Sequence, residues 1–407
     1  MSETPSLSSP DMPSSSLPTE LLHEIFLYVK QSSRRDVVAC SAVCRSWRGT
    51  ALPLWWERLT LDVDCLGDTR LIHIHFDAMN RFLSKSPLHC SYVQKVVLNL
   101  QIFAGEGEQS SGSLLLPSKH RLSRTSVLPL IVSIINMVSP IRTLQLKGFS
   151  KDSLGADLFF CALIKRSLLQ HLVCVKVVDK ERWWFPDGAH PFLRWLSSLQ
   201  HLHTIHFRGL NLEFPSTLST SSRMIAFRSQ SLHSLTLTQV SVLQTIEPLL
   251  SGCQGLRLLE IVGSHRLSIA RCVRQVPRCC RQLEHFRLVV YADTSTTHHN
   301  AFGAYLSIEA AIEPLLRGCT ALRTLEVSGV EEMGDAGLRT MLQYGQGLHT
   351  LMVRGSPGIT GAGMETIMRD TGAWKSLRHL DMKGCSNLRS ELLEVVSEIY
   401  PLLRVTV

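Results

Sequence analysis

The chain has 407 residues, of which 44% are hydrophobic and 19% are charged, and its formal charge of +8 comes from 42 Lys and Arg against 34 Asp and Glu. This composition excludes an intrinsically disordered chain, and the length allows a large core or two domains. The basic residues are scattered along the chain and form no dense Lys/Arg run, so we do not expect nucleic acid as the main ligand.

The first residues carry no sign of secretion. Residues 1–16 are rich in Ser and Pro and predict a flexible tail, without the charged and apolar regions of a signal peptide. The most apolar run, Val127 to Val138, is shorter than the roughly 20 residues that cross a bilayer. The 12 cysteines lack zinc-ligand spacing. We therefore expect reduced cysteines in a cytoplasmic or nuclear protein without a membrane-spanning helix.

Residues 17–60 predict three short helices. In LPTELLHEIFLYVK, residues 17–30, Pro18 suits the first helical position and Glu20 complements the helix dipole. A broad apolar stripe follows at helical spacing: Leu21, Leu22, Ile25, Phe26 and Val29. Asp36 is expected to cap the second helix, and Pro53 is expected to end the third.

The strings LPTELLHEIFLYV, DVVACSAVCRSWR and LPLWWERL together resemble an F-box. The linker KQSSRR before Asp36 is a few residues longer than the common form of that family. The resemblance implies a domain that binds a Skp-type adaptor, and through it the cullin and RING subunits of an SCF ubiquitin ligase. The adaptor-binding residues implied by position are Leu17, Pro18, Leu21, Leu22, Ile25, Phe26, Val43, Cys44 and Trp47.

Residues 61–407 repeat an LxxLxL-like unit, which predicts a leucine-rich-repeat solenoid of the α/β class. Strands are expected on the concave face and helices on the convex face, in an irregular arc that resembles cysteine-containing leucine-rich repeats. The eleven units begin at Val93, Ile141, Leu169, Leu202, Leu232, Leu256, Leu283, Leu322, Leu348, Leu377 and Leu402. The third unit is interpreted as Leu169-Leu172-Cys174, and residues 104–126 are expected to form a polar insertion.

In each predicted strand, the residues between the core positions point to the opposite, concave side. A broad sheet face with charges, His and Met suits a protein ligand better than a small molecule. The candidate substrate-binding residues on it are His206, Arg208, Glu260, Arg287, Glu326, Met352, Arg354, Asp381 and Lys383. In the third unit, Val173 is expected at the central concave position.

Two other groups of residues are weaker candidates. Trp183, Trp184 and Phe185 are either an exposed partner site or a plug beneath a loop, and we favour the plug. His298 and His299 lack further metal ligands nearby. The sequence contains no nucleophile motif, phosphate-binding glycine loop or HExxH helix. We therefore expect no enzyme activity, no cofactor and no metal.

The joint presence of both signatures predicts a substrate-recognition adaptor of an SCF-type ubiquitin ligase. In the alternative interpretation, the N-terminal helices only cap the solenoid, because the terminal repeats of a solenoid need a cover. The protein would then be a scaffold or regulator outside a ubiquitin ligase.

Overall fold

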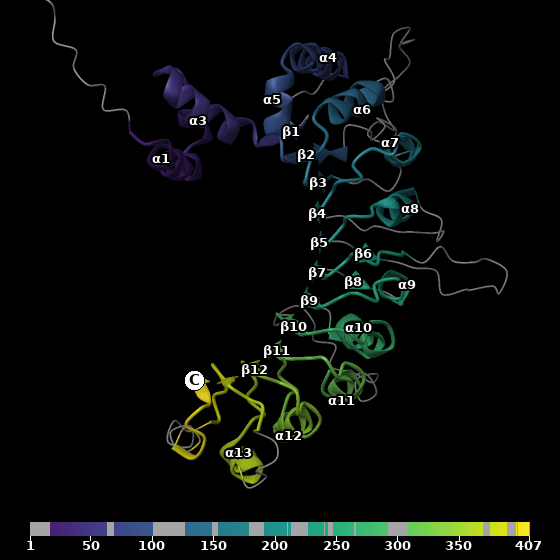
Figure 1. Ribbon diagram of the computed structural model, residues 1–407. Helices are drawn as coiled ribbons and strands as arrows, with labels where there is room; N and C mark the ends of the chain where they lie inside the picture. Colours follow the sequence, from purple (N-terminus) through teal and green to yellow (C-terminus); the bar gives the residue numbers. More distant parts are fainter. Residues whose placement is uncertain are drawn as a thin grey trace, which may run out of the picture.

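A small helical unit is followed by a long arc of strand–helix repeats (Figure 1). The computed structural model describes residues 17–62, 69–100, 127–148, 154–178, 191–209, 211–212, 227–239, 241–242, 247–263, 266–291, 308–368, 375–388, 396 and 398–406. The predicted tail at 1–16 and the insertion at 104–126 lie outside these residues. The same holds for Trp183, Trp184, Phe185, His298 and His299.

The helical unit consists of α1 (Thr19–Ser32), α2 (Arg34–Ser41) and α3 (Arg45–Trp56). Helix α1 begins directly after Pro18, whose carbonyl oxygen accepts the N–H of Leu22 at 3.0 Å. The prediction for Asp36 was wrong, because α2 begins at Arg34 and Asp36 lies inside its first turn. Pro53 does not end α3 either. A proline removes only one N–H donor, and near the end of α3 the helix tolerates that loss and continues to Trp56.

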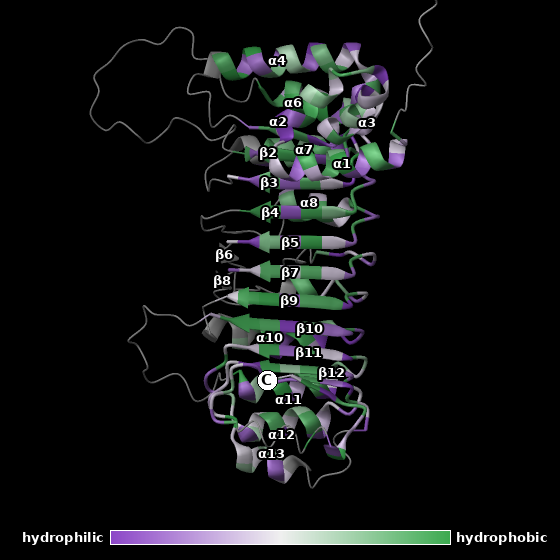
Figure 2. Cartoon of the chain, turned by 90° about the vertical axis from the view of Figure 1, so that its left-hand side faces the viewer, coloured by the Kyte–Doolittle hydropathy of each residue, from purple (hydrophilic) through white to green (hydrophobic). Residues whose placement is uncertain are grey.

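The strands form one twelve-stranded parallel sheet, in which each strand pairs with the next one of the series. In sheet order they are β1 (Arg58–Leu61), β2 (Lys95–Asn99), β3 (Thr143–Lys147), β4 (Cys174–Val178), β5 (Thr204–Arg208), β7 (Ser234–Thr238), β9 (Leu258–Gly263), β10 (His285–Val290), β11 (Thr324–Ser328), β12 (Thr350–Arg354), β13 (His379–Asp381) and β14 (Arg404–Thr406). Figure 2 shows this sheet face-on, with its strands lying side by side along the length of the molecule. The two-residue strands β6 (Asn211–Leu212) and β8 (Ser241–Val242) pair with each other.

The eleven predicted repeats each contribute one strand, and β1 is a twelfth strand that the pattern did not predict. The core-facing residues stay in register along the sheet, as with Leu59, Val96 and Leu144, which are all buried. The register of the third unit was wrong. Leu144 pairs with Val175, so this unit is Leu172-Val175-Val177, and its three side chains are buried.

The helices of the repeats lie on the outer side of the arc, and the strands line its inner side (Figure 1). In chain order these helices are α4 (Thr69–Lys85), α5 (Pro87–Tyr92), α6 (Leu128–Met137), α7 (Leu154–Lys165), α8 (Pro191–Ser198), α9 (Glu247–Leu250), α10 (Arg266–Cys279), α11 (Glu309–Gly318), α12 (Asp335–Tyr344) and α13 (Gly361–Met368). A parallel sheet needs such crossover segments between its strands. Among the described helices, none combines the length and apolarity that a membrane span requires.

Several strands end in a tight turn that requires left-handed backbone. Gly329 follows β11 with a φ of +72°, and its N–H donates to the carbonyl oxygen of Arg354 at 2.8 Å. A Cβ at this position would lie 2.0 Å from the carbonyl oxygen of Val290. Glycine is therefore required here both by the backbone conformation and by the close approach of the preceding repeat.

The buried residues form two separate hydrophobic clusters. One runs through the repeats from Leu59 to Leu403. The other, which we call the helical core, belongs to the N-terminal unit and consists of Leu22, Phe26, Val37, Ala51 and Leu54. The N-terminal helices thus bury an apolar core of their own beside that of the solenoid.

Candidate functional site

Helix α1 is apolar on two faces, and only one of them is used inside the protein. Leu22 and Phe26 are buried in the helical core, and the ring of Trp47 packs edge-on against Phe26 with centroids 5.2 Å apart. These two buried residues, which the resemblance placed among the adaptor contacts, are not accessible to a partner in this structure. They hold α1 against α2 and α3, and Trp47 is half-buried beside them.

The other face of α1 is open to solvent. Leu17 is 45% exposed, Leu21 52% and Ile25 45%, and Pro18 is also exposed. Tyr28, which the sequence did not single out, is 72% exposed. Residues at i, i+4 and i+7 share one side of a helix, so Leu21, Ile25 and Tyr28 form a continuous apolar stripe.

A second exposed apolar group lies at the end of α2. Val43 is 62% exposed, Cys44 is exposed and Val38 is 41% exposed. Val43 and Cys44 were predicted from the resemblance, whereas Val38 was not. We call the exposed set Leu17, Pro18, Leu21, Ile25, Tyr28, Val38, Val43 and Cys44 the apolar docking surface.

The junction of the helical unit with the solenoid is polar and well connected. A guanidinium nitrogen of Arg34 donates to the carbonyl oxygen of Trp55 at 2.6 Å and also to that of Arg58. The same guanidinium stacks over the Trp55 ring, 4.8 Å from its centroid. Lys30 forms an ion pair with Glu57. These contacts attach α1 and α2 to the segment that enters the sheet.

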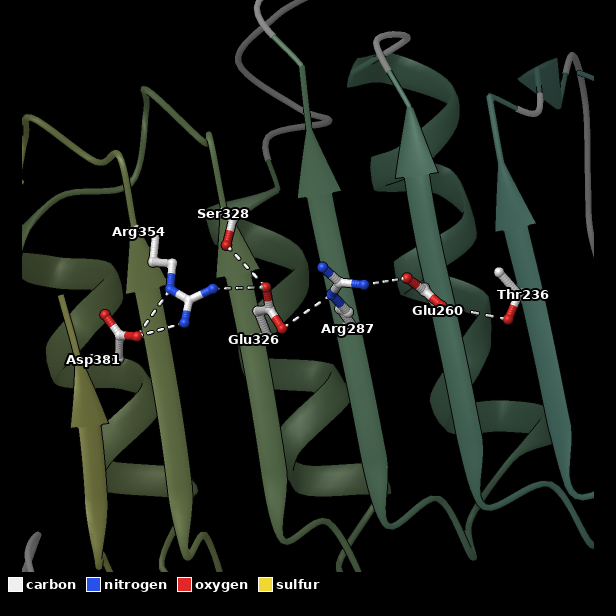
Figure 3. A network of polar contacts seen from close by, with 7 residues as sticks. All are labelled: Thr236, Glu260, Arg287, Glu326, Ser328, Arg354 and Asp381. Carbon is white, nitrogen blue, oxygen red and sulfur yellow. Dashed lines mark hydrogen bonds and ion pairs between the residues drawn. The ribbon is translucent and has the colours of Figure 1, made fainter. Parts of the chain in front are cut away.

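The second candidate surface is the concave sheet face, where charged residues from successive strands join in a network (Figure 3). Arg287 contacts Glu260 at 2.5 Å and Glu326 at 3.0 Å. Arg354 contacts Glu326 at 3.6 Å and Asp381 at 2.5 Å. Each arginine therefore lies between two carboxylates. We call the set Thr236, Glu260, Arg287, Glu326, Ser328, Arg354 and Asp381 the charged ladder.

Five of the nine candidate concave residues belong to the charged ladder, where they form ion pairs with one another. Glu326 is 9% exposed and Asp381 only 4%, so their carboxylates are largely withdrawn from solvent. Met352 is half-buried in line with Glu326 and Asp381, and Lys383 is exposed just after β13. Five of the candidates thus hold strands together, which leaves less of this part of the sheet for a partner.

His206 and Arg208 lie apart from the ladder, on β5. Burial lowers the pKa of His206, the charge of Lys176 lowers it further, and Glu260 opposes this shift. Lys176 is paired with His206 and with Gln145 in the sheet register. The central concave residue of the third unit is therefore Lys176, and the prediction of Val173 was wrong because the unit was displaced by three residues.

The described part of the chain offers no cluster of three or more His, Cys, Asp or Glu side chains that could hold a metal ion. The concave face and the apolar docking surface are both open surfaces of the kind that bind other macromolecules.

Comparison with known proteins identifies the N-terminal unit. Residues 14–62 match the family described as F-box-like. Over 38 residues the chain is 58% identical to Tubby-like F-box protein 6 of Oryza sativa subsp. japonica, covering 8% of this chain and 9% of that protein. Over 57 residues it is 44% identical to Tubby-like F-box protein 2 of Arabidopsis thaliana, covering 12% and 14%. The N-terminal helices are an F-box-like domain, and the similarity covers only a short part of each relative.

Among solved structures, the chain is similar to one titled "Crystal structure of Rad7 and Elc1 complex in yeast". The sequence identity is 14%, the TM-score is 0.36, and the match covers 94% of this chain and 84% of that one.

Proposed function

We propose that this protein is the substrate-recognition subunit of an SCF-type ubiquitin ligase. Its F-box-like domain binds a Skp-type adaptor, through which cullin and RING subunits are recruited, and its solenoid binds a target protein. The chain itself performs no chemistry in this proposal. It holds the target close to a ubiquitin-conjugating enzyme, and proximity raises the rate of transfer.

The observation that carries the proposal is that one apolar face of α1 is buried in the helical core while another apolar face is exposed. Leu22 and Phe26 complete the helical core, and yet Leu21 and Ile25 remain about half exposed on another face. A helix with apolar residues on several faces needs a second apolar contact. An F-box-like domain that displays such a stripe is equipped for a helix-in-groove interaction with an adaptor.

We assign direct adaptor contacts to the exposed members of the predicted set: Leu17, Pro18, Leu21, Ile25, Val43 and Cys44. Tyr28 extends the stripe of α1, and Val38 is a further exposed apolar residue on α2. Leu22, Phe26 and Trp47 act through the fold of the helices, because they form or border the helical core.

We place the boundary between the F-box-like domain and the solenoid between Glu57 and Arg58. Strand β1 begins at Arg58 and pairs with β2 through all four of its residues. The alternative, in which the helices merely cap the solenoid, expects them to share its core. The helical core is a separate cluster, which favours a domain with a surface of its own.

The test is coexpression of the chain with a Skp-type adaptor, followed by pulldown. The double variant Leu21→Ala, Ile25→Ala is expected to lose the complex, since buried interface anchors cost about 2 kcal/mol or more each on truncation. The matched control is His23→Ala, which changes an exposed polar residue on the side of α1 opposite to Leu21 and Ile25. Equal adaptor recovery with the test and control variants, both folded, would refute the proposed docking surface.

A further inference from the structure

The concave face differs sharply between its two halves. From β9 to β13 its charges are paired within the charged ladder. From β1 to β5 it carries cations instead. We call this second group the basic surface, and it consists of Arg58, Lys95, Lys147, Lys176 and Arg208.

The strand register places the basic surface on one side of the sheet. Arg58 is paired with Lys95, and Lys147 lies in one row with Arg208, with Val178 between them. Lys176 lies in the central row. All five alternate along their strands with buried core residues, so they point away from the core. With strands about 4.8 Å apart, the surface is about 20 Å wide from β1 to β5.

These cations repel one another. Burial lowers the pKa of Lys95, the charges of Arg58, Lys176 and Lys147 lower it further, and Cys174 opposes this shift. Across the ranges that the structure describes, no carboxylate forms an ion pair with any residue of the basic surface. The neighbouring Asp62 accepts a hydrogen bond from Asn99 at 2.9 Å. An anionic partner would relieve this repulsion.

The arginines of the charged ladder are paired with carboxylates of the protein, and the residues of the basic surface are not. Arg287 and Arg354 lie on the same concave face, but each is held between two carboxylates of the protein. Arg208 is exposed, and Lys147 and Lys176 are half-buried. Apart from Lys383 and Arg404, the cations of the described concave positions that lack an ion pair are therefore on the half of the sheet that is nearer to the F-box-like domain (Figure 1).

We propose that the basic surface binds an extended acidic segment of the target protein, through the carboxylates of its Asp and Glu residues. This inference rests on the proposed function and specifies where and how the solenoid recognises its target. About 20 Å of strand-like chain corresponds to roughly six residues, which matches a short acidic stretch lying across the five strands. Lysine side chains are flexible point donors and suit separate carboxylates.

The composition of this face favours a peptide over a nucleic acid. Single-stranded nucleic acids are bound by aromatic platforms on which bases stack. The described concave positions between the basic residues mostly carry small, aliphatic or amide side chains: Thr60, Val97, Asn99, Thr143, Gln145, Cys174, Val178 and Thr204. Half-buried His206 is the single ring among these described positions.

The experiment measures the anisotropy of a fluorescein-labelled peptide of about eight Glu residues, titrated with the full chain alone and with the full chain in complex with its adaptor. A peptide with Gln in place of Glu and an oligo(dT) of the same length are the reference probes. The test variant is Lys176→Glu, Arg208→Glu. The matched control is Lys165→Glu, Arg339→Glu, which makes the same change of charge at exposed positions on α7 and α12.

We expect the test variant to weaken Glu-peptide binding at least about tenfold, and the control variant to change it less than about twofold. The charge-preserving variant Lys176→Arg, Arg208→Lys should bind like the unmodified chain. Equal losses in test and control variants, equal binding of the Gln peptide, tighter binding of oligo(dT), or no binding of the Glu peptide would each overturn the inference.

Adaptor recovery separates this inference from the proposed function. If the test variant still copurifies with the adaptor but no longer binds the Glu peptide, the result supports both the acidic-segment inference and the proposed ligase function. If the unmodified chain binds the Glu peptide through the basic surface and never copurifies with the adaptor, the acidic-segment inference holds and the ligase function fails.

Discussion

Arg354 donates two hydrogen bonds to one carboxylate oxygen of Asp381, from Nε at 3.0 Å and from Nη2 at 2.5 Å (Figure 3). The other oxygen of Asp381 accepts the backbone N–H of Lys383 at 3.0 Å. Burial by itself would raise the pKa of Asp381, but these hydrogen bonds and the charges of Arg354 and His379 hold it below its usual range. The ionised carboxylate is therefore a stabilising link between β12 and β13.

We predict that Asp381→Asn lowers the free energy of unfolding by about 2 kcal/mol at neutral pH, because it removes a nearly buried charge that is hydrogen-bonded to Arg354. A depressed folded-state pKa contributes stability that is fully present above the unfolded value near 4 and is lost as pH falls through the folded value. The difference between the two proteins should therefore shrink below about pH 4. Urea unfolding at neutral and acidic pH measures both effects.

The control for this prediction is Asp77→Asn, the same chemical change in the exposed i,i+4 ion pair with Arg81 on α4. Exposed helix pairs of this kind contribute about 0.5 kcal/mol or less. A loss of stability for Asp381→Asn no larger than that for Asp77→Asn would contradict the role assigned to the buried carboxylate.

The strands were predictable because the LxxLxL pattern repeats, whereas the register of the third unit was not. Leu169-Leu172-Cys174 and Leu172-Val175-Val177 both fit the pattern, and only pairing with β3 decides between them. The displacement hid Lys176, which the structure places in the basic surface. Pattern alone also failed to predict β1, whose four residues form only part of one repeat.

Sequence could name the residues of the concave face but not which of them neutralise one another. Arg354 reaches Asp381 and Glu326 across strands, and this diagonal contact depends on side-chain rotamers and burial. The same limit applied to α1. The spacing of its apolar residues indicated a wide apolar stripe, but only the packing of α2 and α3 against it determines that Leu22 is buried and Leu21 is exposed.

Two glycine substitutions are expected to have opposite effects. Gly329→Ala should lower the free energy of unfolding by about 2 kcal/mol or more, because φ is +72° and the new Cβ would meet the carbonyl oxygen of Val290. Gly49→Ala should raise it by up to about 1 kcal/mol, because Gly49 is an exposed position inside α3 with nothing within 4 Å of the new Cβ. Thermal unfolding followed by circular dichroism compares the two variants. A change of the melting temperature in the same direction for both would contradict the prediction.

The independence of the helical core predicts where the chain can be shortened. Trp56 packs against the solenoid core and stacks on Phe82 with centroids 5.6 Å apart. Deletion of residues 1–55 should therefore leave the solenoid folded, while adaptor binding is lost. Limited proteolysis and circular dichroism measure the fold, and pulldown measures the adaptor.

Deletion of residues 1–61 is the contrasting case, since it also removes β1 with buried Leu59 and Leu61. Burial of each leucine contributes about 2 kcal/mol, so this longer deletion should lower the melting temperature clearly. If the shorter deletion already unfolds the solenoid, the helices act as a cap, and the scaffold alternative gains support.

The cysteines allow the docking surface to be mapped directly. Cys44 is exposed within that surface, whereas Cys253 and Cys319 are buried, and burial raises the pKa of each of these two thiols to about 12. Because the thiolate is the reactive form, maleimide at neutral pH should modify Cys44 in the free chain and leave the two buried thiols intact. Half-buried Cys161 on α7 serves as the internal reference.

In the complex with a Skp-type adaptor, we expect the labelling rate of Cys44 to fall at least about tenfold, because a close-packed interface excludes solvent and reagent. The rate at Cys161 should stay constant, since α7 belongs to the convex side of the repeats, away from the apolar docking surface (Figure 1). Peptide-resolved mass spectrometry measures both rates in one sample. Unchanged labelling of Cys44 in a stable complex would mean that the adaptor binds elsewhere, and the exposed stripe of α1 would then need a different partner.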